Sequence, residues 1–159
     1  AVYVFMQLGA FAIVTMLRRH DVVGDELKDL SGLYFRSPLA AIAMLVFMLS
    51  LGGIPPTAGF MGKFWIFSAV IDQGFVMLAI VGVVNSAISL FYYIRVVVFM
   101  WIKEEVSGSD IALGPAMATT IVITLVASIL FGIYPQPLFE HAQAAAATLG
   151  ATASASILP

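Results

Sequence analysis

Long, almost uncharged apolar blocks are the feature of this sequence that most constrains its fold. Three of them cover residues 1–17, about 75–102 and 115–134, and together they contain one charged side chain, Arg95. A helix needs about 20 apolar residues to cross the hydrocarbon core of a bilayer. The chain is 62% hydrophobic and 10% charged, whereas a soluble domain is about 45–50% apolar and about 25% charged. We therefore interpret the chain as an all-α membrane protein.

The residue types that are absent narrow the chemistry further. The sequence has no cysteine, so thiolate-held iron–sulfur clusters, cysteine-based zinc sites and disulfides are excluded within this chain. The two histidines, His20 and His141, lie far apart near the ends of apolar blocks, where a solvated side chain is more common than a metal ligand. No Walker loop, dinucleotide fingerprint or catalytic triad is present. We expect no cofactor, metal or nucleic acid to bind this chain.

The chain divides into a membrane part, residues 1–137, and an alanine-rich tail, residues 138–159. Ala1 opens directly into an apolar block without a Met or a basic leader, so we expect a fragment that was cut inside a helix. In the segment 21–36, leucines at helical spacing predict a short amphipathic helix on the membrane surface. The composition of the tail predicts a weak surface helix that frays at its end.

Glycines and prolines interrupt the apolar sequence between residues 38 and 71. The residues of this predicted helix break are Gly52, Gly53, Pro55, Pro56, Thr57 and Gly59. Such a cluster cannot continue a regular helix. Thr57 is the only polar side chain from Gly52 to Gly62, whereas a loop in water is usually more polar. We therefore expect a buried, hydrated break whose freed backbone groups bind protein or water.

The segments 38–51 and 57–71 form either one broken membrane crossing or two separate crossings. Lysine and arginine collect on the cytoplasmic side of membrane proteins. One broken crossing puts the basic loop 18–37 on the same side as the loop 103–114 and leaves no basic residue opposite, so this arrangement is favoured. It predicts a bundle of transmembrane helices with one helix broken near 52–57, both loops in the cytoplasm and the C-terminus on the other side. Two crossings remain the alternative.

Lys63 is the most informative residue, because it lies within the apolar sequence FMGKFWI. The nearest polar boundary, at Asp72, is nine helical residues or about 13 Å away, further than a lysine side chain comfortably spans. A lysine in hydrocarbon costs about 2.5–3.5 kcal/mol, so it usually faces a polar cavity and has a function. Burial disfavours the charged form of an amine, which suits a proton relay. The alternative is a structural lysine that snorkels to the interface or pairs with a carboxylate.

Polar side chains also follow one face of the block 75–102. Asn85, Ser89, Tyr92 and Tyr93 recur at i, i+4 and i+7 or i+8, a spacing that brings side chains together on a helix. These residues are candidates for the lining of a water path beside the buried lysine. Hydrogen bonding between packed helices explains the pattern equally well, and both interpretations stay open.

Four phrases of the sequence together resemble one known family. They are SPLAAIAMLVFMLSLGGIPPTAGFMGKFWIFSAV, NSAISLFYYIRVVVFMW, DLSGLYFRSP and GIYPQPL. Over nearly all its length except the tail, the chain resembles the subunit N family of bacterial NADH–quinone oxidoreductase, or respiratory complex I, whose mitochondrial counterpart is NADH dehydrogenase subunit two. The string LSLGGIPPTAGFMGKF is the most specific part, since the wider antiporter-like family shares only a looser version of it.

The resemblance implies an antiporter-like fold of fourteen helices, of which this chain would be the last third, with 38–71 as the broken twelfth helix. It implies that Lys63 is a protonatable residue of a proton channel that leads to the periplasmic side of the bacterial inner membrane. NADH, FMN, iron–sulfur clusters and quinone would bind to other subunits. The partners would be other membrane subunits of complex I, lipid, protons and internal water, and the chain would be a proton-pumping subunit without a redox centre.

Two other functions are compatible with the residues. One is a subunit of a cation/proton antiporter of the same superfamily, which transports ions without redox coupling. The other is a membrane scaffold in which Lys63 is merely paired. The sequence segments YYIRV and GIPPTAGFMGKF favour the complex I subunit.

Overall fold

The computed structural model describes residues 2–19, 26–102 and 114–155, and all of the regular structure in these ranges is helical. The elements in chain order are α1 (Val2–Arg19), the 3₁₀ turn η1 (Leu27–Leu30), α2 (Leu33–Arg36), α3 (Pro38–Gly52), α4 (Ala58–Asp72), α5 (Val76–Ile102), α6 (Pro115–Ile133) and α7 (Gln136–Ala155). The described part of the chain is therefore all-α, as the apolar blocks predict.

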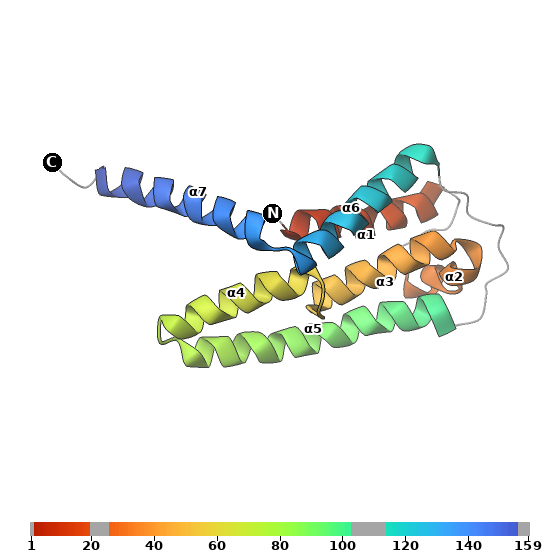
Figure 1. The fold of residues 1–159 in the computed structure, drawn as a ribbon. Helices are drawn as coiled ribbons and strands as arrows, with labels where there is room; N and C mark the ends of the chain where they lie inside the picture. The colour runs from red at the N-terminus through yellow and green to blue at the C-terminus, as the bar shows by residue number, and fades with distance from the viewer. Residues whose placement is uncertain (1, 20–25, 103–113, 156–159) are drawn as a thin grey trace.

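The helices form a bundle in which α3 and α4 follow one another along the length of α5 (Figure 1). Helices α1 and α6 pack together on the other side of α3, and α7 extends away from the bundle (Figure 1). At Gly9, α1 approaches α3 so closely that a Cβ would overlap the ring of Phe47. The core between α1, α3, α5 and α6 is apolar, and its fully buried side chains include Met6, Ile13, Leu17, Phe47, Met100 and Ile121.

The helices differ in length in a way that bears on how they cross a membrane. α5 has 27 residues and is about 40 Å long, whereas α3 and α4 have 15 residues each and are about 22 Å long. Within the described ranges, α5 over Val76–Trp101 and α6 over Pro115–Ile133 are long and apolar enough to cross a membrane, by length and composition only. α1 and α3 are apolar but shorter.

Large apolar side chains cover much of the outer surface of α4 and α5. Phe64 on α4 and Met77 and Phe91 on α5 are each more than half exposed. A protein in water rarely exposes such a wide apolar surface. This surface therefore suits contact with lipid or with further apolar helices.

Several helix ends gather at one end of the bundle. The end of α1, the short helix α2, the start of α3, the end of α5 and the start of α6 all lie there (Figure 1). The helices that flank the predicted loops 18–37 and 103–114 therefore meet at the same end. Residues 20–25 and 103–113 themselves lie outside the described residues.

The structure differs from the sequence prediction in the segment 21–36. Residues 26–36 form a 3₁₀ turn and a single α-helical turn instead of one amphipathic helix, and the rest of the segment lies outside the described residues. The first turn ends at Ser31, which is extended, and Gly32 precedes the second turn in a left-handed conformation with φ 66°. Leu30 and Leu33 are buried in the core of the bundle. The described part of the predicted short amphipathic helix is thus two successive turns, which these leucines anchor to the bundle.

The alanine-rich tail is helical for most of its length. α7 begins at Gln136, directly after Pro135, and continues to Ala155. Its contact with the bundle includes the ring of Phe139, whose centroid lies 5.0 Å from that of Trp65 on α4. Residues 141–148 are exposed. The predicted fraying falls on residues 156–159, which lie outside the described residues.

A substitution at Gly132 tests how closely α6 packs on the connection between α3 and α4. A Cβ at this position would overlap backbone atoms of Pro56, Thr57 and Ala58, and backbone cannot move aside as a flexible side chain can. We expect Gly132→Ala to lower the free energy of unfolding of the intact protein by about 1–3 kcal/mol. Thermal unfolding in detergent or lipid measures this change.

Gly62→Ala is the matched control. A Cβ on Gly62 meets no atom of the described residues within 4 Å, and alanine favours a helix over glycine by up to about 1 kcal/mol. The control should keep or slightly raise the stability. Equal stability of Gly132→Ala and Gly62→Ala would contradict the close packing of α6 on the connection.

Candidate functional site

The end of α3 has the hydrogen bonds of a Schellman motif. Gly53 adopts a left-handed conformation with φ 82° and ψ 44°. Its N–H donates to the carbonyl of Ser50 over 3.0 Å, and the N–H of Ile54 donates to the carbonyl of Leu49 over 3.0 Å. A helix leaves its last four carbonyls without partners inside the helix, and this motif satisfies two of them.

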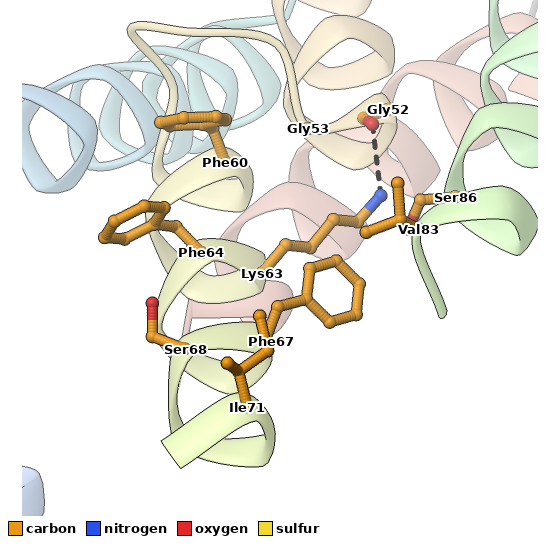
Figure 2. Close-up of a pocket in the computed structure, with 10 residues that line it drawn as sticks. All are labelled: Gly52, Gly53, Phe60, Lys63, Phe64, Phe67, Ser68, Ile71, Val83 and Ser86. Carbon is orange, nitrogen blue, oxygen red and sulfur yellow. Dashed lines mark hydrogen bonds between the residues drawn. The ribbon is translucent and has the colours of Figure 1, made fainter. Parts of the chain in front are cut away.

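Lys63 of α4 satisfies the other two carbonyls. Its Nζ donates to the carbonyl of Leu51 over 3.0 Å and to that of Gly52 over 3.1 Å. Figure 2 shows the side chain reaching from α4 back to the end of α3. The carbonyl end of a helix carries a partial negative charge of about half an electron, so it attracts an ammonium group. The positive charge and the free carbonyls therefore stabilise each other.

Backbone groups, not carboxylates, are the partners of Lys63 in the part of the chain that the structure describes. The side chain is half-buried, and its ammonium group lies at the end of a helix. The sequence left open whether a structural lysine here snorkels to the interface or pairs with an acid. The structure shows a third arrangement, in which the lysine is bound to the C-terminal end of α3.

The start of α4 lies directly against the end of α3. The N–H of Gly59 donates to the Oγ of Ser50 over 3.2 Å. A Cβ on Gly59 would overlap the backbone oxygen of Ser50, so only glycine permits this approach. Thr57 at the N-cap position donates its hydroxyl to the carbonyl of Ile54 over 2.6 Å. This hydrogen bond closes the turn between the two helices.

The connection between α3 and α4 falls on the glycines and prolines that the sequence singles out. α3 ends at Gly52 and α4 begins at Ala58. Thr57 is buried, whereas Pro55 and Pro56 are exposed in the connection. The connection is therefore enclosed on the side that faces α3 and α6 and open at its two prolines.

A cavity of about 330 Å³ lies beside Lys63, between α4, α5 and the end of α3 (Figure 2). Its walls are mostly apolar and include Phe60, Phe64, Phe67, Ile71 and Val83. Ser68 of α4 and Ser86 of α5 add hydroxyl groups. A water molecule in the liquid occupies about 30 Å³, so the cavity has room for several waters next to the lysine.

The four polar residues predicted for a water path lie on α5 outside the lining of this cavity, although Cδ2 of Tyr93 would lie 3.9 Å from a Cβ on Gly52. Asn85 and Tyr92 are exposed, and Ser89 donates its hydroxyl to the backbone oxygen of Asn85 over 2.9 Å. Tyr93 packs against the apolar core. None of the four lines the cavity beside Lys63. The water path along these residues stays a prediction.

A different face of α5 meets the lysine site. Val83 and Ser86 line the cavity, and a Cβ on Gly52 would lie 2.7 Å from the side chain of Leu90. Val83, Ser86 and Leu90 recur at i, i+3 and i+7, which is also a helical spacing. The sequence pattern instead pointed to the face with Asn85, Ser89 and Tyr92, because polar side chains recur there at helical spacing. It also missed Ser50, whose only sign is its place in the last turn before the glycines.

The sequence matches, over residues 1–89, the protein family described as "NADH:quinone oxidoreductase/Mrp antiporter, TM". The matched residues are more than half of the chain and include the helix break and Lys63. The chain belongs to this family of membrane proteins. Membership gives it a membrane location, which agrees with the apolar outer surface of α4 and α5.

Several curated relatives in this family are similar over most of the chain. The chain is 42% identical over 136 residues to NADH-quinone oxidoreductase subunit N 1 of Koribacter versatilis. These residues are 86% of this chain and 27% of the relative. The chain is 44% identical over 144 residues to NADH-quinone oxidoreductase subunit N of Desulforamulus reducens, which covers 91% of this chain and 30% of the relative. The chain thus spans 27–30% of the length of these relatives.

A solved structure has a similar fold. The chain superposes on one chain of respiratory complex I from Thermus thermophilus with bound aureothin, with a TM-score of 0.65 and 30% sequence identity. The match covers 83% of this chain and 32% of that chain. The resemblance to the subunit N family that the sequence phrases indicate is confirmed by these similarities.

Gly53→Ala tests the contact between the end of α3 and Lys63. Alanine in the left-handed conformation costs about 1–2 kcal/mol. Here a Cβ would also lie 2.9 Å from Cδ and 3.3 Å from Nζ of Lys63. We expect Gly53→Ala to lower the free energy of unfolding by more than this backbone strain alone, and thermal unfolding of the intact protein measures the loss.

Gly74→Ala, at the end of α4, is the matched control. Gly74 has the same φ of 82° and the same Schellman pair of hydrogen bonds, but a Cβ there meets no atom of the described residues within 4 Å. The excess loss at Gly53 should disappear in a Lys63→Ala background. An excess that persists without the lysine would show that another contact causes it.

Proposed function

We propose that this chain is part of a proton-translocating membrane subunit of an NADH–quinone oxidoreductase. In this proposal, protons cross the membrane through Lys63 while electrons pass from NADH to quinone in other subunits. The observation that carries the proposal is the ammonium group of Lys63 at a helix break, hydrogen-bonded to two carbonyls beside a cavity. The family of the chain and its similarity to subunit N support it.

The hydrogen bonds of Lys63 are compatible with both protonation states of its side chain. A charged ammonium group has three N–H donors, and a neutral amine keeps two of them. The carbonyls of Leu51 and Gly52 use two donors, so the third proton is the one available for transfer. The lysine can give this proton to water and accept another without leaving either carbonyl unpaired.

We infer that α3 and α4 together form one broken membrane crossing. They run in succession along α5 (Figure 1), whose 27 residues span about 40 Å. With 15 residues each, α3 and α4 reach about 22 Å, less than the hydrocarbon core of about 30 Å. Two separate crossings would require each of these short helices to span the core alone.

The basic side chains support one orientation of the bundle. Arg18, Lys28 and Arg36 belong to α1, η1 and α2, at the end of the bundle where α5 ends and α6 starts (Figure 1). Basic residues collect on the cytoplasmic side of membrane proteins. We therefore assign the loops 18–37 and 103–114 to the cytoplasm and the C-terminus to the periplasm of a bacterial inner membrane.

The proposed partners follow from the same role. Other membrane subunits of complex I and lipid would cover the apolar outer surface of α4 and α5, and internal water would carry protons to and from Lys63. NADH, FMN, iron–sulfur clusters and quinone would bind elsewhere in the complex. The chain would contribute proton transfer to the oxidoreductase without holding a redox centre.

A cation/proton antiporter without redox coupling is the second candidate, because the family description also names Mrp antiporters. The two candidates differ in what drives proton movement. Proton transfer that requires NADH oxidation, and neighbouring genes for other complex I subunits, identify the oxidoreductase. Proton transfer that instead depends on a second cation identifies the antiporter.

Lys63→Ala in the assembled complex should reduce proton translocation by about tenfold or more, because no protonatable side chain then remains at the break. NADH–quinone turnover should fall with it where the two reactions are tightly coupled. Lys63→Arg should not restore translocation, because arginine keeps its proton in proteins. Acidification of vesicles during NADH oxidation, followed with a pH-sensitive dye, measures the effect.

Lys28→Ala is the control for this experiment. It is the same substitution at a lysine whose side chain is 80% exposed in the turn η1, and it should leave proton translocation unchanged. Normal proton translocation by a correctly assembled Lys63→Ala complex would refute the proposed role of the lysine.

A further inference from the structure

We propose that Ser50 is a positioning residue for proton transfer by Lys63. Its buried hydroxyl holds the start of α4 against the end of α3, and this contact sets the position of Lys63 at the helix-end carbonyls. The inference rests on the proposed function of Lys63. It extends that function to a residue that does not itself exchange protons.

The hydroxyl of Ser50 joins three helices. Ser50 lies on the last turn of α3 and is 0% exposed. Its Oγ accepts the N–H of Gly59 on α4 over 3.2 Å and donates to the sulfur of Met6 on α1 over 2.7 Å. A serine hydroxyl has a single donor and two acceptor lone pairs. The donor is used by α1, and one acceptor is used by α4.

Several other hydroxyl groups in the described helices bind within their own helix. Ser89, Thr119 and Thr120 each donate to the carbonyl four residues earlier, which is a common arrangement for serine and threonine in helices. A hydroxyl bound to its own backbone does not orient a neighbouring helix. Ser50 binds two other helices instead, so its loss would remove one hydrogen bond to each of them.

Ser50 and Lys63 both bind at the junction between the end of α3 and the start of α4. Ser50 directly precedes Leu51 and Gly52, whose carbonyls bind Lys63, and Gly59 lies four residues before Lys63 on α4. Residues four apart lie on the same face of a helix, one turn from each other. A displacement of α4 at Gly59 would therefore carry the ammonium group of Lys63 away from both carbonyls.

The hydrogen bond between Ser50 and Gly59 does not depend on the charge of Lys63, because it joins two neutral groups. Hydrogen bonds from an ionised group are about twice as strong as neutral ones. Lys63 therefore holds the two helices together least when it has released its proton. In that state Ser50 keeps α4 in place, so the lysine returns to the same carbonyls when it is protonated again.

The test is Ser50→Ala in the assembled complex. We expect proton translocation to slow by about fivefold or more, because the N–H of Gly59 loses its partner and Lys63 is held less accurately. The KM values for NADH and quinone should not change, because the junction binds neither. Ser50→Thr keeps the hydroxyl group and should restore most of the rate. If the side chain of Ser50 only filled space, keeping the hydroxyl would not restore the rate.

Ser128→Ala is the matched control. Ser128 on α6 is 1% exposed, and its Oγ has no hydrogen-bond partner among the described residues. Removing this buried hydroxyl should leave proton translocation unchanged. Ser50→Cys is a second variant in case Ser50→Ala does not assemble. Because a thiol forms only weak hydrogen bonds, the rate of Ser50→Cys should fall below that of the unmodified complex.

Three results would overturn the positioning role: a full rate in Ser50→Ala or Ser50→Cys, an equal loss in Ser50→Thr, or an equal loss in Ser128→Ala. The failure of the proposed function is distinguishable from these. Normal translocation by Lys63→Ala refutes the function, whereas a loss in Lys63→Ala together with a full rate in Ser50→Ala refutes only the role of Ser50.

Discussion

The contact between the ammonium group of Lys63 and the end of α3 is the interaction on which the rest of the structure depends. In an apolar medium, an unpaired backbone carbonyl is costly and a lone charge is more so. The end of α3 leaves the carbonyls of Leu51 and Gly52 without partners in the helix, and the lysine binds both. Each feature would be unfavourable alone, and together they compensate each other. The C-terminal end of α3 and the half-buried Lys63 are therefore one structural unit.

The packing around this unit brings backbone close to backbone. Gly59 lets α4 touch the end of α3, and Gly132 lets α6 touch the connection between them. In membranes, where lipid is as apolar as the side chains, small residues favour helix association because they allow such close contact. The partners of Lys63 are thus backbone carbonyls that the surrounding helices hold in place. This leaves the charge and the third N–H of the lysine as the parts of the site that can change.

Much of the break could be predicted from the sequence, because glycines and prolines interrupt a helix through their own backbone properties. Prediction failed where the result depends on packing. Leucines at helical spacing predicted one helix in the segment 21–36, but a left-handed Gly32 divides the described part, and Leu30 and Leu33 face the core. Val83 and Ser86 of α5 line the cavity beside Lys63, and the spacing of the polar side chains on α5 did not single them out. Spacing defines the faces of a helix, and only its neighbours decide which face meets the site.

By itself, the sequence determined that this chain is helical and apolar, that no regular helix continues from Gly52 to Gly59, and that Lys63 lies far from the polar end of its own helix. These properties depend on backbone preferences and on the neighbours of each residue along the chain. Only the tertiary structure decided that Lys63 binds carbonyls eleven and twelve residues earlier, and that Ser50 holds the start of α4. Those contacts join different helices, whose relative positions follow from the packing of whole faces and not from local sequence.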